Sequence, residues 1–345
     1  MIEIALATDA NYFCGLLVTA VSLARHASPD ADLRFNVLDG GIPDADWADF
    51  EEKVCVAHPR SAFRRFRVDD ARFAAFPEWN GRSRFTYARL LLPALMPDAD
   101  WVVYCDVDFL WCADIGELWA LRDPRAVVLS TPDGTEDARA REAPWFSARG
   151  LAYDFETYFC AGLSFFNLAL WRRFGLAEKT LAFLDAHTDV QLADQSALNA
   201  ILGGAPLTPD VVNVKMLPAK WQTMSRFATA DDIRRGCVLH YAGDTPWRQA
   251  WRTQPLTDLH LLWHAVHGGL RGESADASVA RFFPKGAVRL RRFVFRLAAA
   301  PVLRELVFLA YRLTGRSGYL PWMRACCRRL PVDELARWLT GGAGA

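Results

Sequence analysis

The sequence contains no apolar stretch long enough to span a membrane as a helix. Its best candidate, residues 293–311, is interrupted by residues that a bilayer core disfavours, namely Arg296, Pro301, Arg304 and Glu305. The sequence also lacks both common phosphate-binding patterns, Gly-x-Gly-x-x-Gly after a first strand and Gly-x-x-x-x-Gly-Lys-Ser/Thr. We therefore expect neither a membrane-spanning helix nor an ordinary dinucleotide or P-loop site.

Cysteine spacing typical of metal or redox motifs is absent as well. The eight cysteines form no Cys-x-x-Cys pair and lie mostly in apolar stretches, which is typical of reduced residues that fill a core. The first residues read directly as a strand, with no basic leader before them. From these features we expect a protein of the reducing cytoplasm.

Net charge is zero, because 40 Lys and Arg balance 40 Asp and Glu, but the two signs are segregated. Residues 1–280 carry 27 basic and 37 acidic side chains, whereas residues 281–345 carry 13 and 3. The basic residues of 281–330 are interleaved with aromatic ones, which favours attachment to an anionic membrane surface. A helical cap on the acidic body is the alternative. Nucleic-acid binding is not expected, because no motif for it is present.

What the sequence does contain is an alternation of strand-like and helix-like segments. Strands are predicted at 2–7, 34–38 and 63–68, and helices at 12–26 and 44–52. Short strands separated by helices predict an α/β fold with a mostly parallel central sheet flanked by helices. With 345 residues, 52% of them hydrophobic, the chain can bury a large core.

The second half of the chain continues this pattern less regularly. Further strands are predicted at 125–129, 158–167 and 237–241. A long ordered loop is expected after Pro132, and a helix is expected to open at Asp194, with Asp194 as its cap. Glycine and polar residues at 268–278 predict a linker, so we expect a catalytic domain over 1–270 and a basic helical C-terminal segment over 271–345.

Two carboxylates, Asp106 and Asp108, follow the apolar run of residues 101–105 in an Asp-x-Asp pattern. A carboxylate at the end of a buried strand must be hydrated, paired or bound to a cation. Far along the chain, His240 ends another predicted strand. Two oxygen donors and one imidazole suit Mn²⁺ or Mg²⁺, so these three residues are predicted as a metal site. Taken alone, such a histidine is more often an ordinary core or surface residue.

The end of the first strand supplies two more polar groups, Asp9 and Asn11. In open α/β sheets ligands bind beyond the carboxyl ends of the strands, where the Asp-x-Asp pair also falls. This edge of the sheet is therefore the candidate binding site. A simple turn after the first strand would use the same two residues, and that alternative stays open.

At this point the chain resembles the family 8 glycosyltransferases, in particular bacterial lipooligosaccharide α-galactosyltransferases and their glucosyl-transferring relatives. The resemblance spans about residues 1 to 255 and rests on short segments that agree in order and spacing. These segments are Ala7–Tyr12, Thr86–Leu90, Tyr104–Asp108, Tyr158–Gly162, Asn167–Leu168, Trp171–Arg172, Asp194–Gln195 and His240–Gly243. The resemblance implies a GT-A fold, a UDP-sugar donor and a retaining transfer that needs Mn²⁺ or Mg²⁺.

For the nucleotide, the resemblance implies that the three predicted ligands hold the metal and that Asp9 and Asn11 lie near the uracil and ribose. The other positions expected to contact the nucleotide are Asp106, Val107, Gly243 and Arg248.

For the sugar, the resemblance implies that Arg89 and Asp194 face the donor and that Gln195 acts on its β face. An amide is a poor nucleophile, so Gln195 is expected to stabilise an oxocarbenium-like sugar. Two plainer interpretations remain open: Arg89 as a structural ion-pair partner, and Asp194 as the cap of its helix.

The chain departs from the family pattern at two places. The family commonly has Asn where Cys160 stands, so a polar contact to the donor could be lost. The family also places a Lys shortly after the metal His, reaching the diphosphate, whereas this chain reads Gly243 to Trp247 there and is one residue shorter. Arg248 could substitute for that Lys.

The resemblance therefore predicts a metal-dependent retaining hexosyltransferase, which moves galactose or glucose from a UDP-sugar to a saccharide or glycolipid acceptor in lipopolysaccharide or other cell-surface glycan synthesis. With the basic C-terminal segment, the expected location is the cytoplasmic face of the membrane, as a peripheral protein. The alternatives are a catalytically impaired nucleotide-sugar-binding protein of the same fold and a membrane-surface interaction module.

Overall fold

The computed structural model describes residues 1–78, 84–133, 136–151, 154, 156–243, 245–248, 255–313 and 328–340. The chain forms two compact units, each built from segments that are not adjacent in sequence. The first unit comprises Met1–Leu16, Ala24–Val107 and Asp114–Trp221, and the second comprises Leu17–Leu23, Asp108–Ala113 and Gln222–Ala345. The functional division into 1–270 and 271–345 stays a prediction.

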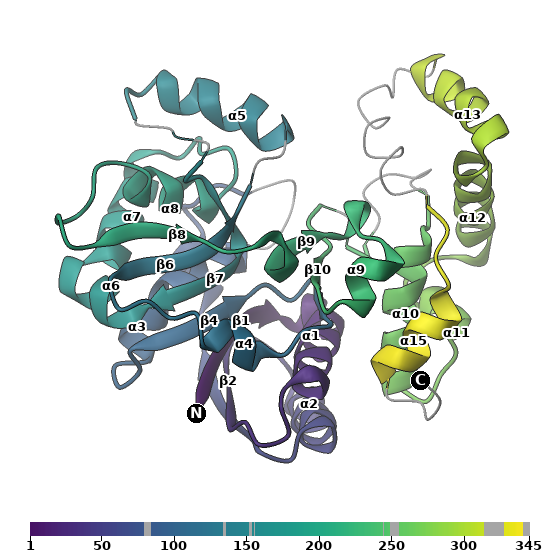
Figure 1. Cartoon of the computed structure of the whole chain (residues 1–345), viewed down its shortest axis with the longest axis horizontal. Coiled ribbons are helices and arrows are strands. Elements are labelled where there is room, and N and C mark those ends of the chain that lie inside the picture. The colour runs from purple at the N-terminus through teal and green to yellow at the C-terminus, as the bar shows by residue number, and fades with distance from the viewer. Residues whose placement is uncertain are drawn as a thin grey trace. The chain divides into compact units, whose positions relative to one another are not determined.

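The first unit is built on a seven-stranded sheet (Figure 1). In spatial order its strands are β3 (Ser61–Arg67), β2 (Leu33–Gly40), β1 (Ile2–Asp9), β4 (Trp101–Cys105), β7 (Phe159–Asn167), β6 (Ala126–Pro132) and β8 (Val212–Met216). All neighbouring strands pair in parallel except at β7, which is antiparallel to both β4 and β6. The predicted α/β fold with a mostly parallel central sheet is therefore confirmed.

The central strands are continuous apolar runs because both of their faces are covered. All nine residues of β7 are buried, and in β4 only Trp101 is partly exposed. A strand buried on both faces shows no alternation of apolar and polar residues, which is why these runs could be recognised from sequence. Leu6 of β1 lies opposite Cys105 of β4, so the ends of these two strands reach the same edge of the sheet.

Helices and 3₁₀ turns connect the strands. In this unit they are η1 (Ala10–Tyr12), α1 (Phe13–His26, of which 17–23 belong to the second unit), α2 (Asp44–Ala57), η2 (Asp70–Phe73), η3 (Arg84–Leu91), α3 (Leu92–Leu95), α4 (Ile115–Trp119), α5 (Glu136–Ser147), α6 (Leu168–Phe174), α7 (Leu176–Ala186), α8 (Asp194–Leu202) and η4 (Ala219–Gln222, of which Gln222 belongs to the second unit). α6 shows why such helices begin and end where they do. The Asn167 side chain accepts from the Leu170 N–H at 3.1 Å, and Gly175 ends the helix at φ 59°.

The long loop predicted after Pro132 is wrong in part, because α5 lies within it. Its first eight residues, 136–143, are mostly Glu, Ala and Arg, which are strong helix formers. Pro144 suggested a loop, but it lies three residues before the helix ends, and it removes a single hydrogen bond, the one from its own position to the carbonyl of residue 140. Asp133 remains outside the helix, immediately after β6.

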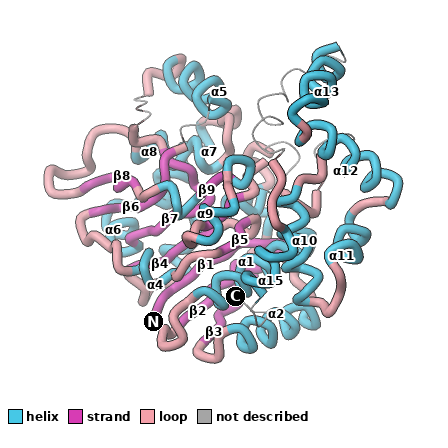
Figure 2. The backbone as a smooth tube through the Cα atoms, turned by 45° about the vertical axis from the view of Figure 1, so that its right-hand side comes forward, coloured by secondary structure: helices cyan, strands magenta, loops and turns pink. Residues whose placement is uncertain are grey.

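The second unit contains a three-stranded sheet of β5 (Phe109–Trp111), β10 (Val238–His240) and β9 (Thr223–Met224). Part of α1 holds β5 in place, since Thr19 Oγ1 donates to the Phe109 carbonyl at 2.8 Å and Ser22 Oγ accepts from the Trp111 N–H at 3.0 Å. Its helices include η5 (Ser225–Phe227), α9 (Ala230–Arg234), α10 (Asp258–Leu270), α11 (Ala275–Phe282), α12 (Lys285–Ala299), α13 (Pro301–Leu313) and α15 (Val332–Thr340) (Figure 2). The predicted linker at 268–278 is wrong in part, because α10 continues to Leu270 and α11 begins at Ala275.

Two buried histidines of α10 share one serine of α11. His264 Nδ1 and His267 Nδ1 each lie 2.8 Å from Ser278 Oγ, and His264 Nε2 lies 3.1 Å from the Pro246 carbonyl. Since that carbonyl only accepts, Nε2 carries the proton of His264 and its Nδ1 accepts from the serine hydroxyl. Ser278 Oγ then accepts from His267 Nδ1, so each of these three contacts pairs a donor with an acceptor while both imidazoles are neutral.

These histidines predict a loss of stability in acid. Burial lowers the pKa of His264 to about 3 and that of His267 to about 4. Because the unfolded chain takes up these protons first, stability is complete above pH 6.5 and falls as pH drops, by about 2 kcal/mol for each histidine between pH 7.5 and 5. Urea unfolding at both pH values measures this. His264→Gln should make the free energy of unfolding depend less on pH. A native urea midpoint that is the same at pH 7.5 and pH 5 would contradict the prediction.

Candidate functional site

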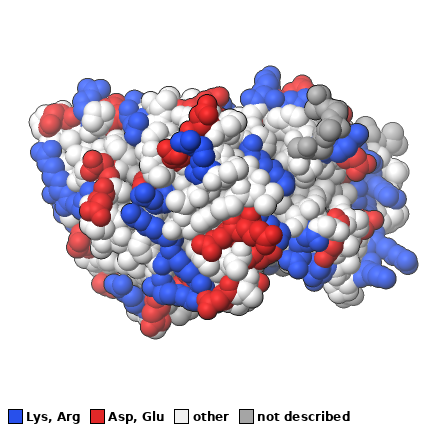
Figure 3. Space-filling model, turned by 90° about the horizontal axis from the view of Figure 1, so that it is seen from below, with Lys and Arg blue, Asp and Glu red and all other residues white. Residues whose placement is uncertain are grey.

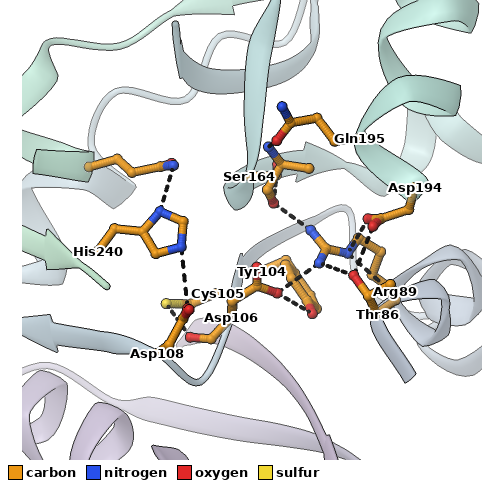
Figure 4. Close-up of polar contacts among 12 residues, drawn as sticks. Thr86, Arg89, Tyr104, Cys105, Asp106, Asp108, Ser164, Asp194, Gln195 and His240 are labelled. Carbon is orange, nitrogen blue, oxygen red and sulfur yellow. Dashed lines mark hydrogen bonds and ion pairs between the residues drawn. The ribbon is translucent and has the colours of Figure 1, made fainter. Parts of the chain in front are cut away.

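Asp106 and Asp108 lie where the chain leaves β4. The Asp106 N–H donates to the Gly162 carbonyl at 2.8 Å, so pairing with β7 continues for one residue beyond the strand. Asp108 precedes β5. With His240, the two aspartates each offer a ligand atom, and these atoms all lie within 4.8 Å of one another. The structure thus brings together the three residues that were predicted as a metal site (Figure 4).

The pairing of β10 with β5 positions His240. It lies opposite Phe109, and the two rings stack at 4.1 Å with 8° between their planes. The Tyr241 N–H donates to the Asp108 carbonyl at 2.9 Å, and His240 Nε2 lies 3.2 Å from Asp108 Oδ1. The other ring nitrogen, Nδ1, lies 3.1 Å from the side-chain amide of Gln222, which is buried. One ring nitrogen is therefore held by the amide and the other points at the carboxylate.

This donor set fits a divalent cation. Carboxylate oxygens and a neutral imidazole nitrogen are ligands of Mn²⁺ and Mg²⁺. A histidine that binds a metal normally uses its second ring nitrogen for an orienting hydrogen bond, and Gln222 is placed to make it. A half-turn of the Gln222 amide lets its oxygen accept from Nδ1–H, which leaves the Nε2 lone pair for a metal.

Arg89 is a fully buried cation that joins two of the site's carboxylates. Arg89 Nη2 lies 2.7 Å from Asp106 Oδ1, and Nε lies 2.8 Å from Asp194 Oδ2. The guanidinium also donates to the Ala161 carbonyl and lies 4.1 Å from the centroid of the Tyr104 ring. Burial opposes its charge, but the two carboxylates outweigh burial and raise the pKa of Arg89. Arg89 is thus an ion-pair partner, and its contact with a donor sugar stays a prediction.

Asp194 does not cap its helix, so that prediction is wrong. α8 begins at Asp194, so the N-cap position falls on Ala193, whose side chain cannot cap the first turn. The carboxylate instead accepts from Thr86 Oγ1 at 2.8 Å and pairs with Arg89. Burial raises the pKa of Asp194, and the charge of Arg89 partly offsets that effect. A buried carboxylate gains more from a charged partner than from a backbone N–H at a helix end.

The backbone just before Asp194 is strained. Ala193 has φ 51° and ψ −130°, and it is the one non-glycine residue with positive φ in the described part of the chain. Such a conformation costs about 1–3 kcal/mol and is found mainly at functional sites.

Gln195 is held by contacts at both ends of its amide. Its Oε1 accepts from the Ala161 N–H at 3.0 Å, and its Nε2 donates to Asp133 Oδ2 at 2.8 Å and to the Tyr158 hydroxyl at 3.3 Å. Because an N–H must face the oxygen and a carboxylate must face the nitrogen, these partners fix the orientation of the amide. Its action on a sugar stays a prediction.

Asp9 and Asn11 form the turn that the sequence left open as the alternative to nucleotide contact. Asp9 Oδ1 accepts from the Asn11 N–H at 2.8 Å and caps η1, and Asn11 is exposed. This turn leaves the second carboxylate oxygen of Asp9 and the Asn11 side chain to other partners, so their contact with a nucleotide stays a prediction.

For the remaining residues predicted to bind or to affect binding of the donor, the structure gives burial, backbone conformation or backbone hydrogen bonds. Val107 is buried between the two aspartates. Gly243 has φ 76°, a left-handed conformation that favours glycine. Arg248 is exposed, and its N–H donates to the Thr245 carbonyl at 3.1 Å. Cys160 is buried, and its carbonyl accepts from Ser130 Oγ at 2.8 Å. Contacts of these four with a donor stay predictions.

Three residues of the site were not assigned a role from sequence. Thr86 and Tyr104 lie inside segments that carry the family resemblance, and the polar neighbours of Arg89 could have pointed to them. Tyr104 donates to Asp106 Oδ1 at 3.0 Å. Gln222 stands in no motif, because it reaches His240 only through the fold.

Comparison with known proteins gives the family. The family model described as Glycosyl transferase family 8 matches residues 3–250. General stress protein A of Bacillus subtilis is 28% identical over 199 residues, which are 56% of this chain and 66% of that protein. The aligned region thus spans just under two thirds of the length of this curated relative.

Solved structures agree on the fold. The galactosyltransferase LgtC, crystallised with donor and acceptor sugar analogues, superposes with a TM-score of 0.58 at 24% identity, covering 83% of this chain and 98% of that chain. The bifunctional glycosyltransferase WbbM superposes with a TM-score of 0.60 at 20% identity, and the match covers 85% of this chain and 52% of that chain. With the GT-A fold shared and the family match extending over most of its length, the chain belongs to glycosyl transferase family 8.

Proposed function

We propose that this protein is a metal-dependent retaining transferase that moves a hexose, galactose or glucose, from a UDP-sugar to a saccharide or glycolipid acceptor. The observation that carries the proposal is the cluster of Asp106, Asp108 and His240 in a chain of family 8. Two carboxylates and an imidazole are the groups that would grip a divalent ion on a nucleoside diphosphate. We place the acceptor in lipopolysaccharide or other cell-surface glycan synthesis, on the strength of the sequence resemblance.

In the proposed reaction, the bond between the anomeric carbon and the diphosphate oxygen breaks, and a bond from the acceptor oxygen to the same face of that carbon forms. Bound Mn²⁺ or Mg²⁺ would neutralise charge on the departing diphosphate. The diphosphate takes the proton of the acceptor hydroxyl. Gln195 keeps a fixed amide whose oxygen stabilises positive charge on the sugar, and Arg89 holds Asp106 and Asp194 through ion pairs.

A thermal-shift series with UDP-galactose, UDP-glucose and UDP, each with Mn²⁺ or with EDTA, tests the proposal. A ligand at about 100 times its dissociation constant adds about 2.7 kcal/mol to native stability, so we expect a metal-dependent rise in Tm with at least one UDP-hexose. Slow release of free hexose in the same mixture separates a transferase from an inert binder. No Tm shift with any nucleotide would favour a membrane-surface interaction module instead.

Replacing Gln222 should lower the affinity for the metal more than the rate of the chemical step. Gln222→Met keeps the volume but removes the partner of His240 Nδ1, and loss of such an orienting group lowers metal affinity by about 10–100-fold. We expect a higher Mn²⁺ requirement with kcat near native at saturating metal. Gln191→Met, at a half-buried glutamine bonded to Asp189, is the matched control. An unchanged Mn²⁺ titration in Gln222→Met would contradict this role.

We further propose that α12 and α13 attach the protein to the cytoplasmic face of the membrane as a peripheral protein. α12 and α13 pack against each other through a small cluster of Phe295, Ala298, Val307 and Phe308. Large apolar side chains remain exposed on both helices, namely Leu290, Phe293, Leu303, Leu306, Leu309 and Leu313. Apolar residues next to several arginines favour an anionic lipid surface.

On the face shown in Figure 3, Lys and Arg side chains lie among Asp and Glu side chains. No described helix is both long and apolar enough to cross a bilayer. Residues 314–327 of the predicted basic segment lie outside the described residues.

Flotation with vesicles tests this attachment. The full-length protein should float with vesicles containing anionic phosphatidylglycerol and about tenfold less with neutral ones, and the double variant Leu306→Glu/Leu309→Glu should stay at the bottom. Val56→Glu, at an exposed valine of α2, controls for a charge added to the surface. Equal flotation of the double variant and the native protein would contradict the proposal.

A further inference from the structure

A second polar network lies behind Gln195, and the proposed reaction does not use it. Its centre is Glu142 of α5, which has no exposed surface. Ser196 Oγ donates to Glu142 Oε1 at 2.9 Å, and the Tyr158 hydroxyl also hydrogen-bonds this carboxyl. A carboxyl this deep in a core is destabilising unless its partners or its protonation compensate, and such groups gather at functional sites.

Ser196 connects Glu142 to the strained turn before Asp194. Its hydroxyl donates to Glu142 and accepts from the Leu192 N–H at 2.8 Å. Between Leu192 and Ser196 lies Ala193 with its positive φ. A backbone in that conformation persists only where surrounding contacts hold it. Glu142 therefore anchors the hydroxyl that closes this turn.

Tyr158 connects Glu142 to the amide of Gln195. The phenol has one proton, so when it donates to Glu142 its oxygen is left to accept from Gln195 Nε2 at 3.3 Å. A protonated Glu142 would donate to the phenol instead, and the phenol proton would turn away from Glu142. The phenol is then a poorer acceptor for Gln195 Nε2, and the same amide would depend more on its other acceptor, Asp133, at 2.8 Å.

We propose that Glu142 is a positioning residue for sugar transfer, which holds the turn before Asp194 through Ser196 and the Gln195 amide through Tyr158, and does so best when ionised. The inference rests on the proposed function, because Gln195 is the group that Glu142 would position against the sugar.

The groups that face Glu142 place its ionisation near neutrality. Burial raises the pKa of Glu142 to about 7, with the charge of Asp133 acting in the same direction. Hydrogen bonds from Ser196 and Tyr158 and the charge of Arg141 act in the opposite direction. Glu142 therefore gains its charge as pH rises through 7, and the Gln195 amide should reach its working geometry over the same range.

Selective ¹⁵N labelling of glutamine side chains reads this coupling directly. The sequence has five glutamines, so the Gln195 amide signal can be identified as the one missing from Gln195→Glu. We expect that signal to shift with pH around 7 in the native protein and to be flat in Glu142→Gln. Glu3→Gln, at a partly buried glutamate that accepts from Arg34 and Asn36, should leave the titration unchanged.

Kinetics supply the second measurement. At pH 8, Glu142→Gln should lower kcat for a UDP-hexose about tenfold with KM within about twofold, and should remove the ionisation near pH 7 from the kcat profile. If Glu142→Gln does not fold, Tyr158→Phe breaks the same connection and should also flatten the Gln195 titration.

A Gln195 signal that does not respond to pH in the native protein, or that still titrates in Glu142→Gln, would overturn the inference. A native protein that transfers hexose to neither water nor an acceptor would instead refute the proposed function, and the Gln195 titration would still decide whether Glu142 controls the amide.

Discussion

Asp108→Asn is expected to abolish transfer, lowering kcat/KM at least about 1,000-fold, while the protein remains folded. Asparagine keeps the size of the side chain and loses the negative charge that faces His240 at 3.2 Å. A hard divalent ion then has one fewer anionic ligand, and the diphosphate loses several kcal/mol of stabilisation as it leaves. Asp108 is a cleaner choice than Asp106, which also pairs with Arg89.

Initial rates of UDP release over a Mn²⁺ titration measure this effect, with circular dichroism to confirm folding. Asp98→Asn is the matched control, because Asp98 is an exposed aspartate just before β4. Its rates should equal those of the native protein. If Asp108→Asn turns over within tenfold of the native rate, Asp108 is not a ligand of the proposed metal site.

Arg89→Met should lower the free energy of unfolding by about 3–5 kcal/mol. Only 1% of the Arg89 side chain is exposed, and its guanidinium pairs with Asp106 and with Asp194. The Asp194 side chain is 5% exposed. Removing the cation leaves a buried carboxylate without its counter-charge, and burial then drives Asp194 to take up a proton. Transfer activity should fall as well, because Asp106 loses the partner that orients it.

Chemical denaturation of four proteins measures this: native, Arg89→Met, Asp194→Asn and the double variant. Neutralising Asp194 removes most of the penalty, so the double variant should be more stable than Arg89→Met alone. Arg60→Met serves as the control, since the Arg60–Asp32 pair is about half exposed and should cost less than about 1 kcal/mol. A loss below 1 kcal/mol in Arg89→Met would contradict a structural role for this ion pair.

The parts that could be predicted from sequence depend on local pattern. β1 and β2 follow from short, mostly apolar segments, β3 follows from a strand-like segment after the next helix, and β4 and β7 follow from mostly apolar runs that are buried because both faces of the sheet are covered. Asp106 and Asp108 stood out because they interrupt such a run. His240 was joined to them by the chemistry of the three donors and by the family resemblance, and no local pattern could show that it pairs with Phe109, which lies 131 positions earlier.

The parts that could not be predicted depend on tertiary contacts. Nothing near Arg89 in sequence indicates that it bridges two carboxylates, because Asp106 and Asp194 come from different segments of the chain. The alanine at 193 gives no sign of a positive φ, which glycine or asparagine would have suggested. Glu142 belonged to a segment expected to be a loop, so its burial beside Ser196 could not be foreseen.

Anomalous diffraction at the manganese edge, from crystals grown with UDP and Mn²⁺, tests the metal site most directly. We expect one strong peak beside the diphosphate, with an oxygen of Asp106, an oxygen of Asp108 and Nε2 of His240 all about 2.0–2.3 Å away. UDP bound without manganese, or a peak that His240 does not reach, would contradict the proposed site.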